Sequence, residues 1–254
     1  MVLDLLDSVI GVVVTVALAG AAVYSGAFTA TAGFIAALFA SVIVVCAGFP
    51  FLAILVLFVV GSVLATRYGF EQKRRAHVQE GTAGERGVDN VLAHVLIPTA
   101  LALGYAADPA ALSTAELAVL FTSALAFGAA DTFASEFGVL SGTARSILSG
   151  RPVPPGTNGG VSAVGEVWAA TGAIVTACLA VVFFVAFGTG VGGAVVVIPV
   201  AALAGFLACQ VDSVLGETLE NRALLTKHGT NLLAMLASVA LAALFTLLAG
   251  TWAL

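Results

Sequence analysis

Long apolar runs, separated by short polar segments, recur along the whole chain. Each run has about the 17 to 25 residues that an α-helix needs to cross roughly 30 Å of hydrocarbon. The second and third runs are separated only by Gly48-Phe49-Pro50 and are the least well defined. We therefore expect eight transmembrane helices, near residues 6–25, 28–47, 49–66, 89–107, 114–131, 161–187, 191–212 and 230–252.

The composition agrees with this pattern and excludes a water-soluble fold. The chain has 254 residues, of which 61% are hydrophobic and only 9% charged, whereas soluble domains are about 25% charged. The sequence predicts an all-α, polytopic helix bundle, a single transmembrane domain over residues 1–254, with membrane lipids around it. The net charge of −5 gives no reason to expect nucleic acid as a partner.

The basic residues indicate how the bundle is oriented. All nine Lys and Arg residues fall in three connections, near 67–89, 132–161 and 213–229. With eight helices, the connections after the third, fifth and seventh helices emerge on one face, and the positive-inside rule makes that face cytoplasmic. Both termini are then outside. Taken singly, a cation such as Arg74 or Arg222 can serve topology alone.

The acidic residues gather on the same face and suggest more than topology. Ten of the fourteen carboxylates lie on or near it: Glu71, Glu80, Glu85, Asp89, Asp131, Glu136, Glu166, Asp212, Glu217 and Glu220. Ionisable groups at the edge of a membrane helix are costly and are candidates for function. We therefore expect the chemistry on the cytoplasmic face.

The strongest local signal is the segment Asp131-Thr132-Phe133-Ala134-Ser135-Glu136, which follows directly on an apolar helix. In helical geometry Asp131 and Ser135 share a face, whereas Glu136 lies about 140° from Asp131. Both carboxylates can then bind one metal ion only if the helix ends or unwinds here. Alternatively, the two carboxylates only mark a helix end.

A second segment, Asp212-Ser213-Val214-Leu215-Gly216-Glu217, repeats the order of the first and also ends an apolar helix. The repetition suggests an internal duplication of helix-pair units, although six positions also allow coincidence. On this interpretation, Asp131, Glu136 and Asp212 converge on Mg²⁺, which takes a few carboxylates and leaves room for water and phosphate oxygens.

Between these segments lies a loop rich in proline and glycine. It contains Arg151 and the run Gly156-Thr157-Asn158-Gly159-Gly160, and it leads into the next helix. Gly-rich backbone at a helix N-terminus presents N–H groups that suit phosphate. The alternative is a rigid turn at the membrane surface, because the run lacks the Lys-Ser/Thr of a P-loop.

The first and last polar connections add further candidates. Arg67, Lys73 and Arg86 can clamp a nucleotide triphosphate, or can belong to a solvated loop. Asn90 and His94 share one face of the next helix, and His94 is either a site residue or a packing residue. On the last helix, Asn231 is a candidate for ligand binding or for interhelical hydrogen bonding.

These motifs resemble those of the integral membrane phytyl-phosphate kinase family. The resemblance runs from about Gly61 to the C-terminus and is carried by the segment from Asp131 to Ser141, the stretch from Pro154 to Ser162, and Asp212 to Gly216. The first of these is also similar to the pattern of CTP-dependent polyprenol kinases such as dolichol kinase, and more distantly to membrane cytidylyltransferases. His94 departs from the family pattern, in which we expect asparagine.

The resemblance implies transfer of the γ-phosphoryl group of CTP to an isoprenyl monophosphate such as phytyl or geranylgeranyl phosphate, assisted by Mg²⁺. It implies a catalytic metal site at Asp131, Glu136 and Asp212. The expected substrate- and phosphate-binding residues are Lys73, Arg67, Arg86, Asn90, Thr132, Ser135, Arg151, Gly156, Thr157, Asn158, Gly159, Gly160, Ser213 and Asn231.

Three alternatives remain at the level of sequence. An isoprenoid alcohol kinase or a CDP-lipid-forming cytidylyltransferase would use the same carboxylates. A transporter would fit the eight helices and the repeat, but it needs polar groups near the bilayer midplane.

The small residues Gly188, Gly190, Gly192 and Gly193 can pack helices within one chain or in a homodimer.

Overall fold

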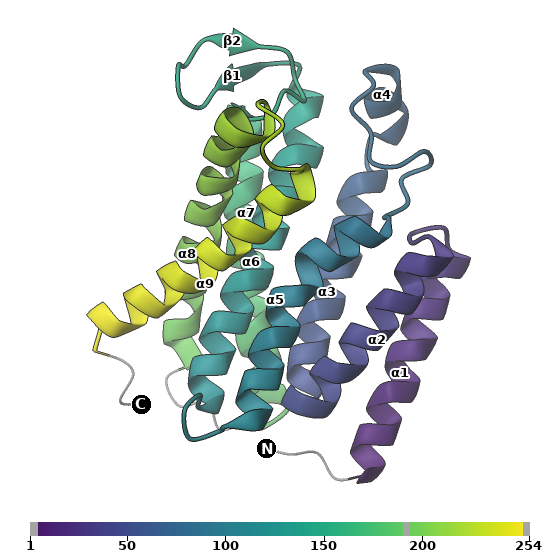
Figure 1. Cartoon of the computed structure of the whole chain (residues 1–254), viewed down its shortest axis with the longest axis vertical. Coiled ribbons are helices and arrows are strands. Elements are labelled where there is room, and N and C mark those ends of the chain that lie inside the picture. The colour runs from purple at the N-terminus through teal and green to yellow at the C-terminus, as the bar shows by residue number, and fades with distance from the viewer. Residues whose placement is uncertain (1–4, 190–193, 251–254) are drawn as a thin grey trace.

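The computed structural model describes residues 5–189 and 194–250, and in this part of the chain eight helices are long and apolar enough to cross a membrane. Figure 1 shows them packed into one bundle. They are α1 (Leu5–Tyr24), α2 (Ala30–Ala47), α3 (Phe49–Arg67), α5 (Val88–Ala107), α6 (Thr114–Gly138), α7 (Ala163–Ala186), α8 (Ala194–Leu215) and α9 (Lys227–Leu248). The predicted polytopic helical fold is confirmed.

The structure confirms the predicted boundary between the second and third helices. Gly48 separates α2 from α3 with a φ of 97°, and Pro50 lies in the first turn of α3. A left-handed glycine followed by a proline ends one helix and begins the next. The predicted start of the seventh helix at residue 191, and the small residues Gly190, Gly192 and Gly193, lie outside the described residues.

One helix end was predicted wrongly. The fifth apolar run was expected to end at Asp131, but α6 continues to Gly138. The polar residues of the last turns did not need to reach the surface, because Asp131 and Glu136 receive hydrogen bonds from side chains of other elements. Asp131 and Glu136 therefore stay on different sides of one intact helix.

Helix α6 is the centre of the bundle. In the apolar stretch that contains α6, 83% of the residues are buried inside the protein, compared with 11% in α1. Glycines allow its neighbours to come close: a Cβ on Gly172 of α7 would lie 2.7 Å from the Ala129 carbonyl oxygen, and one on Gly205 of α8 would lie 2.7 Å from the Phe127 nitrogen. Small residues at such crossings are typical of membrane bundles. Residues on α6 are consequently held at fixed positions relative to α7 and α8.

The three basic connections lie at one end of the bundle, as predicted (Figure 1). The first contains α4 (Phe70–Arg75), the second η1 (Val139–Ser141) with β1 (Ala144–Ser146), β2 (Pro152–Val153) and β3 (Gly160–Val161), and the third the π-helix η2 (Gly216–Glu220). β1 is the middle strand and pairs antiparallel with both others. Which side of the membrane this polar end faces stays a prediction.

Candidate active site

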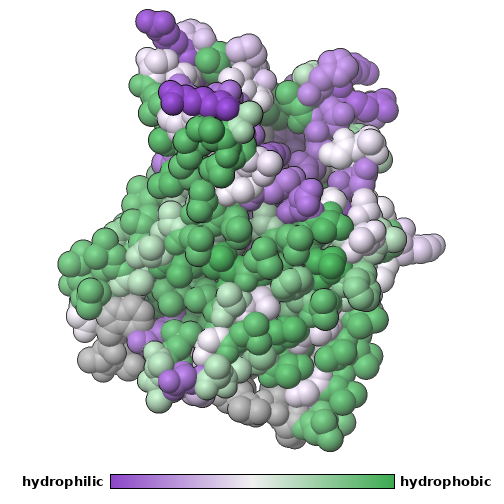
Figure 2. Space-filling model, in the orientation of Figure 1, coloured by the Kyte–Doolittle hydropathy of each residue, from purple (hydrophilic) through white to green (hydrophobic). Residues whose placement is uncertain are grey.

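A cavity of about 320 Å³ opens at the polar end of the bundle. Figure 2 shows hydrophilic side chains around a hollow at this end, above a largely apolar body. The walls of this polar cavity come from α6, the loop between β2 and α7, α8 with η2, the start of α9, and residues 77–80 before α5. The site is thus assembled from all three polar connections, which lie far apart in the sequence.

Two aspartates face this cavity from parallel helices. Asp131 on α6 and Asp212 on α8 both line it. Oδ2 of Asp131 accepts a hydrogen bond of 3.3 Å from Nδ2 of Asn231, whereas Oδ1 of Asp212 is buried and has no hydrogen-bond partner among the described residues. A buried carboxylate oxygen without a partner is costly unless a cation satisfies it. The pair therefore provides a place for a cation.

Mg²⁺ fits this pair of carboxylates. The described residues contain no group of three or more His, Cys, Asp or Glu side chains that could hold a metal ion. Mg²⁺ commonly keeps several waters and is bound through one or two carboxylates together with substrate phosphates. Asp131 and Asp212 suffice for that arrangement, and the partnerless oxygen of Asp212 is the observation that favours it.

Glu136, the third predicted metal ligand, has different partners. Its Oε2 lies 2.6 Å from Nζ of Lys73, and its Oε1 accepts a 2.7 Å hydrogen bond from Oγ1 of Thr66. Lys73 is buried, does not line the cavity, and also donates to the carbonyl oxygen of Ala65 at 2.8 Å. Glu136 lines the polar cavity, but this ion pair binds its carboxylate to Lys73 and fastens α4 to α6. The contacts favour a structural role for the pair, and the predicted metal role of Glu136 and phosphate role of Lys73 stay predictions.

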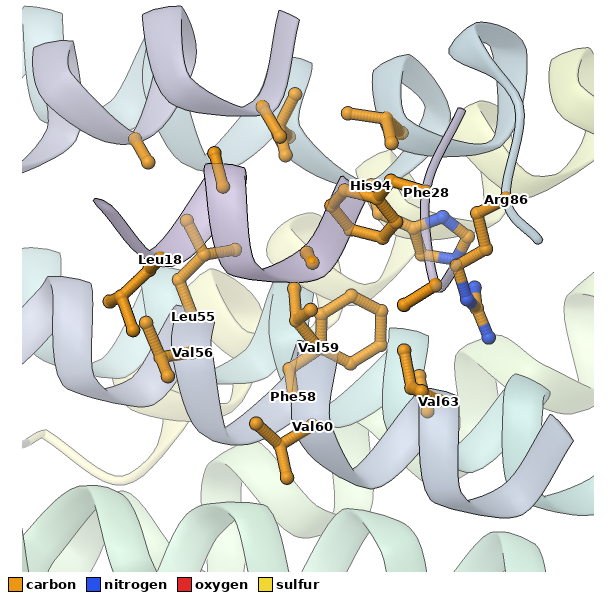
Figure 3. Close-up of a pocket in the computed structure, with 18 of the residues that line it drawn as sticks. Leu18, Phe28, Leu55, Val56, Phe58, Val59, Val60, Val63, Arg86 and His94 are labelled. Atoms are coloured by element: carbon orange, nitrogen blue, oxygen red, sulfur yellow. The ribbon is translucent and has the colours of Figure 1, made fainter. Parts of the chain in front are cut away.

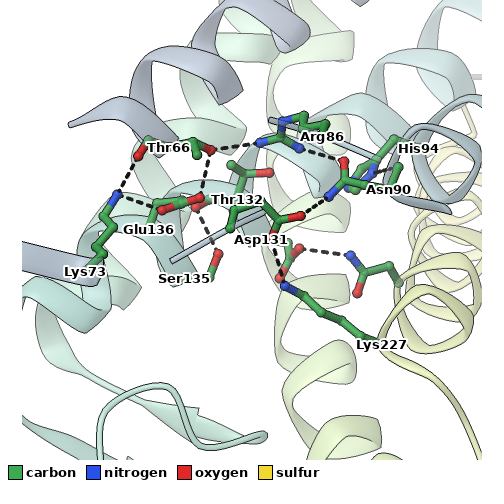
Figure 4. A network of polar contacts seen from close by, with 12 residues as sticks. Thr66, Lys73, Arg86, Asn90, His94, Asp131, Thr132, Ser135, Glu136 and Lys227 are labelled. Carbon is green, nitrogen blue, oxygen red and sulfur yellow. Dashed lines mark hydrogen bonds and ion pairs between the residues drawn. The ribbon is translucent and has the colours of Figure 1, made fainter. Parts of the chain in front are cut away.

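A chain of polar contacts runs from α3 to the cavity (Figure 4). Arg86 donates to Oγ1 of Thr66 at 3.2 Å and to Oδ1 of Asn90 at 2.8 Å. Asn90 donates to Oε1 of Glu80 at 3.1 Å, and Nζ of Lys227 lies 3.3 Å from Oε2 of Glu80. Lys227 is the only Lys or Arg among the described residues that line the cavity. It is therefore the cation best placed for a phosphate.

The charge on Glu80 holds this chain together. Partial burial raises the pKa of the Glu80 carboxyl, but the positive charges of Lys227 and Arg86 outweigh burial, so the pKa lies below its usual value of 4.5. A carboxyl whose pKa is lowered by folding stabilises the folded protein above its ordinary pKa, and the stabilisation is lost as the pH falls through the lowered value. The Glu80 contacts consequently persist at neutral pH.

The glycine-rich run lines the cavity throughout, from Gly156 to Gly160. The glycines are required by close contacts within the protein. Gly156 and Gly159 have φ values of 83° and 74°, and a Cβ would touch Val78 at the first and Glu217 at the second. The run thus packs against two other polar connections, and its phosphate-binding role stays a prediction.

Glu217, the counterpart of Glu136 in the second segment, binds the hairpin formed by β1 and β2. Its carboxylate accepts a 2.6 Å hydrogen bond from Oγ of Ser146 and one of 3.2 Å from the backbone nitrogen of Leu148. In both segments the aspartate faces the cavity and the glutamate binds a neighbouring connection. The internal duplication itself stays a prediction.

Some predicted residues do not reach the cavity. Arg67 is exposed and donates to the carbonyl oxygen of Ser25 at 2.6 Å. Arg151 is exposed on the hairpin that β1 and β2 form. Thr132 is buried on another side of α6, while Arg86 and Asn90 lie behind Glu80. Three predicted residues do line the cavity: Ser135, Ser213 and Asn231. Ser135 lies one turn after Asp131 on the same face of α6, and Ser213 directly follows Asp212. Asn231 lies in the first turns of α9.

Other cavity residues were missed by the sequence analysis. They are His77, Gln79, Glu80, Glu166, Glu220 and Lys227. The signal for Lys227 was present, because it precedes Asn231 by four residues and therefore shares its face of α9. The signal for Glu166 was weaker. Its carboxylate accepts a 2.9 Å hydrogen bond from Nε2 of Gln210 on α8, and these two residues are 44 positions apart in the sequence.

Comparison with known proteins agrees with an integral membrane protein. The chain is 32% identical over 179 residues to an uncharacterized membrane protein of Synechocystis sp. and 34% identical over 190 residues to Protein PGR of Arabidopsis thaliana. It is 28% identical over 189 residues to an uncharacterized membrane protein of Methanocaldococcus jannaschii. The alignments cover 68%, 68% and 74% of this chain and 64%, 66% and 72% of these relatives, respectively.

No solved structure matches the chain significantly. A model of the family described as Integral membrane protein DUF92 matches residues 13–240, nearly the whole described bundle. The chain therefore belongs to the DUF92 family of integral membrane proteins.

Proposed function

We propose that the polar cavity catalyses Mg²⁺-assisted transfer of the γ-phosphoryl group of CTP to an isoprenyl monophosphate at the cytoplasmic membrane face. The observation that carries the proposal is the pair Asp131 and Asp212, which face one cavity with a buried, partnerless carboxylate oxygen. CTP and the isoprenyl acceptor come from the resemblance to phytyl-phosphate and polyprenol kinases. The proposed position of the reaction is the polar cavity, which opens at the polar end of the apolar bundle.

The reaction needs positioning and neutralisation of charge more than a covalent nucleophile. A phosphate oxygen of the acceptor forms a bond to the γ-phosphorus, the bond from that phosphorus to the β,γ-bridging oxygen breaks, and CDP leaves. The acceptor oxygen is already anionic, so no strong base is required. Mg²⁺, when bound, neutralises the phosphate oxygens on which negative charge accumulates.

The residues of this chain divide the remaining work. Asp131 and Asp212 hold the metal ion, and Asn231 orients Asp131 through its hydrogen bond. Lys227 neutralises a phosphate, while Glu80 keeps its side chain in place. The loop from Gly156 to Gly160 closes the cavity on the side of the hairpin and presents backbone N–H groups to the triphosphate.

Cytidylyl transfer to a lipid phosphate is the second candidate, because two aspartates holding Mg²⁺ would serve that reaction equally. An isoprenoid alcohol kinase differs only in needing a base for the hydroxyl proton. Transport is less well supported, since the polar residues gather around a cavity at one end of the bundle (Figure 2).

The test is a phosphotransfer assay on detergent-purified protein with γ-labelled CTP, Mg²⁺ and geranylgeranyl or phytyl monophosphate. We expect labelled isoprenyl diphosphate in the lipid phase, and no label when Mg²⁺ is chelated. Label that enters the free alcohol but not the monophosphate would identify an alcohol kinase. Absence of label from every lipid would reject phosphoryl transfer.

A further inference from the structure

A second cavity, of about 400 Å³, lies between α1, α2, α3 and α5. Its walls are almost entirely aliphatic and aromatic. Figure 3 shows Leu18, Leu55 and Val56 at one end of this apolar cavity and His94 and Arg86 at the other. Leu18, Val60 and Leu64 also line it although they are 42%, 50% and 64% exposed. In a bilayer this exposed rim faces hydrocarbon, so the cavity opens sideways to lipid.

The inner end of the apolar cavity carries buried polar atoms without partners. Nε of Arg86, Nε2 of His94 and Oγ of Ser62 are all buried and form no hydrogen bond among the described residues. The three side chains belong to residues that are only 6%, 3% and 1% exposed. Partnerless polar atoms are costly in an apolar cavity. They point to a ligand that brings a polar group to this end.

The charge of that polar group follows from Arg86 and His94. Arg86 is a buried cation at the inner end of the apolar cavity. Nδ1 of His94 lies 2.8 Å from the carbonyl oxygen of Asn90. A carbonyl can only accept, so Nδ1 carries the proton and Nε2 is left for the ligand. Nε2 of His94 can then only accept a hydrogen bond, which the P–OH group of a singly protonated phosphate donates while its anionic oxygens face Arg86.

Arg86 also connects the apolar cavity with the active site. The same guanidinium binds Thr66 and Asn90, and Asn90 leads through Glu80 to Lys227 in the polar cavity (Figures 3 and 4). Asn90 lines the apolar cavity, whereas Glu80 lines the polar one. The wall between the two cavities is therefore formed by this hydrogen-bonded chain.

We propose that the apolar cavity binds the hydrocarbon tail of the acceptor lipid, which enters from the bilayer past Leu18, Val60 and Leu64 and places its anionic head at Arg86. This inference rests on the proposed function, because it identifies the lipid with the isoprenyl phosphate. It adds a place for the tail and an entrance from the bilayer, and it places the head at the hydrogen-bonded chain that separates the two cavities.

A size variant on α2 tests the tail site. Ala40 lines the apolar cavity, whereas Leu38 on the same helix does not line it and is 51% exposed. We expect Ala40→Phe to raise KM for geranylgeranyl monophosphate about tenfold or more, without changing KM for CTP or turnover of a five-carbon isoprenyl monophosphate. Leu38→Phe should behave as the unchanged protein. Unchanged kinetics in Ala40→Phe would overturn the proposal.

Photocrosslinking separates this inference from the proposed function, because it does not depend on activity or on a variant that must fold. Unmodified protein is irradiated with a geranylgeranyl monophosphate that carries a diazirine in its tail, and the labelled peptides are mapped. Labels on the cavity-lining segments of α1, α2, α3 and α5 support the tail site, even if no phosphoryl transfer occurs. Labels confined to α7, α8 or α9, or no labelling, overturn the tail site, even if phosphoryl transfer is observed.

Discussion

Glu136 and Asp212 both have buried carboxylate oxygens, but of these two, only Glu136 forms an ion pair within the described part of the chain. Lys73 lies 2.6 Å away and is itself buried, whereas Oδ1 of Asp212 has no partner among the described residues. A buried ion pair is complete and needs no ligand, and breaking it leaves an uncompensated charge. A lone buried carboxylate oxygen is instead prepared for a cation. The surroundings thus distinguish a glutamate that is held in an ion pair from an aspartate that is available to a cation.

Removing Lys73 should destabilise the protein. We expect Lys73→Met to lower the free energy of unfolding by about 3 to 5 kcal/mol, because it leaves Glu136 buried without its cation. The double variant Lys73→Met with Glu136→Gln should recover a large part of this loss. The measurement is the unfolding temperature in detergent. A double variant no more stable than the single one would argue against a structural ion pair.

Removing one metal charge should affect turnover and leave stability largely unchanged. We expect Asp131→Asn and Asp212→Asn to lower phosphoryl transfer by orders of magnitude while the purified proteins stay monodisperse and unfold near the normal temperature. The matched control is Glu71→Gln, because Glu71 is exposed and, as far as the structure describes the chain, its ion pair is with Arg74 on its own helix. Normal turnover in either aspartate variant would contradict the metal site.

The Lys73–Glu136 pair also shows what the sequence could not provide. Its two residues are 63 positions apart, and no local pattern connects them. Both were expected to contact ligand because each is a charge at the membrane edge. Asp131 and Asp212 line one cavity, because each lies near the polar end of an apolar run and the two runs point in the same direction.

At the level of elements, the hairpin and η2 form one unit that covers the polar cavity. Glu217 binds Ser146 and Leu148, and Gly159 is too close to Glu217 to carry a side chain. The extension of α6 to Gly138 was not predictable from its polar residues, because their partners lie on α3, α4 and α9. The glycine run was expected to bind phosphate, and this packing explains its glycines without that role.

Loosening the hairpin should have a smaller effect than removing an aspartate. We expect Glu217→Ala to reduce turnover moderately and to speed trypsin cleavage after Arg145, which is exposed on the β1–β2 hairpin. Gly159→Ala should do the same, because its Cβ would press on Glu217. A loss equal to that of Asp131→Asn, with unchanged cleavage, would show that Glu217 contacts the ligand directly.

For the whole molecule, helix count and the grouping of polar connections followed directly from the apolar runs and from the positions of Lys and Arg. The lateral cavity could not be foreseen, because α1, α2 and α3 are almost uniformly apolar and their sequence does not show where they leave space. The orientation in the membrane stays a prediction from the positive-inside rule, and it is tested separately.

Cysteine labelling tests the orientation. In a variant whose Cys46, Cys178 and Cys209 are replaced by serine, single cysteines are introduced at the exposed positions Arg151 and Ala110, which lie at opposite ends of the bundle. A membrane-impermeant maleimide should label position 110 in intact cells and position 151 only after lysis. The reverse pattern would place the active site outside.

The most direct test of the central claim is a double-label experiment with CTP that carries one phosphorus isotope at the α position and another at the γ position. After incubation with Mg²⁺ and geranylgeranyl monophosphate, the lipid phase is counted for both isotopes. The account predicts γ label alone in the lipid, lost in Asp212→Asn. Label from the α position in the lipid, or no label from either, would contradict it.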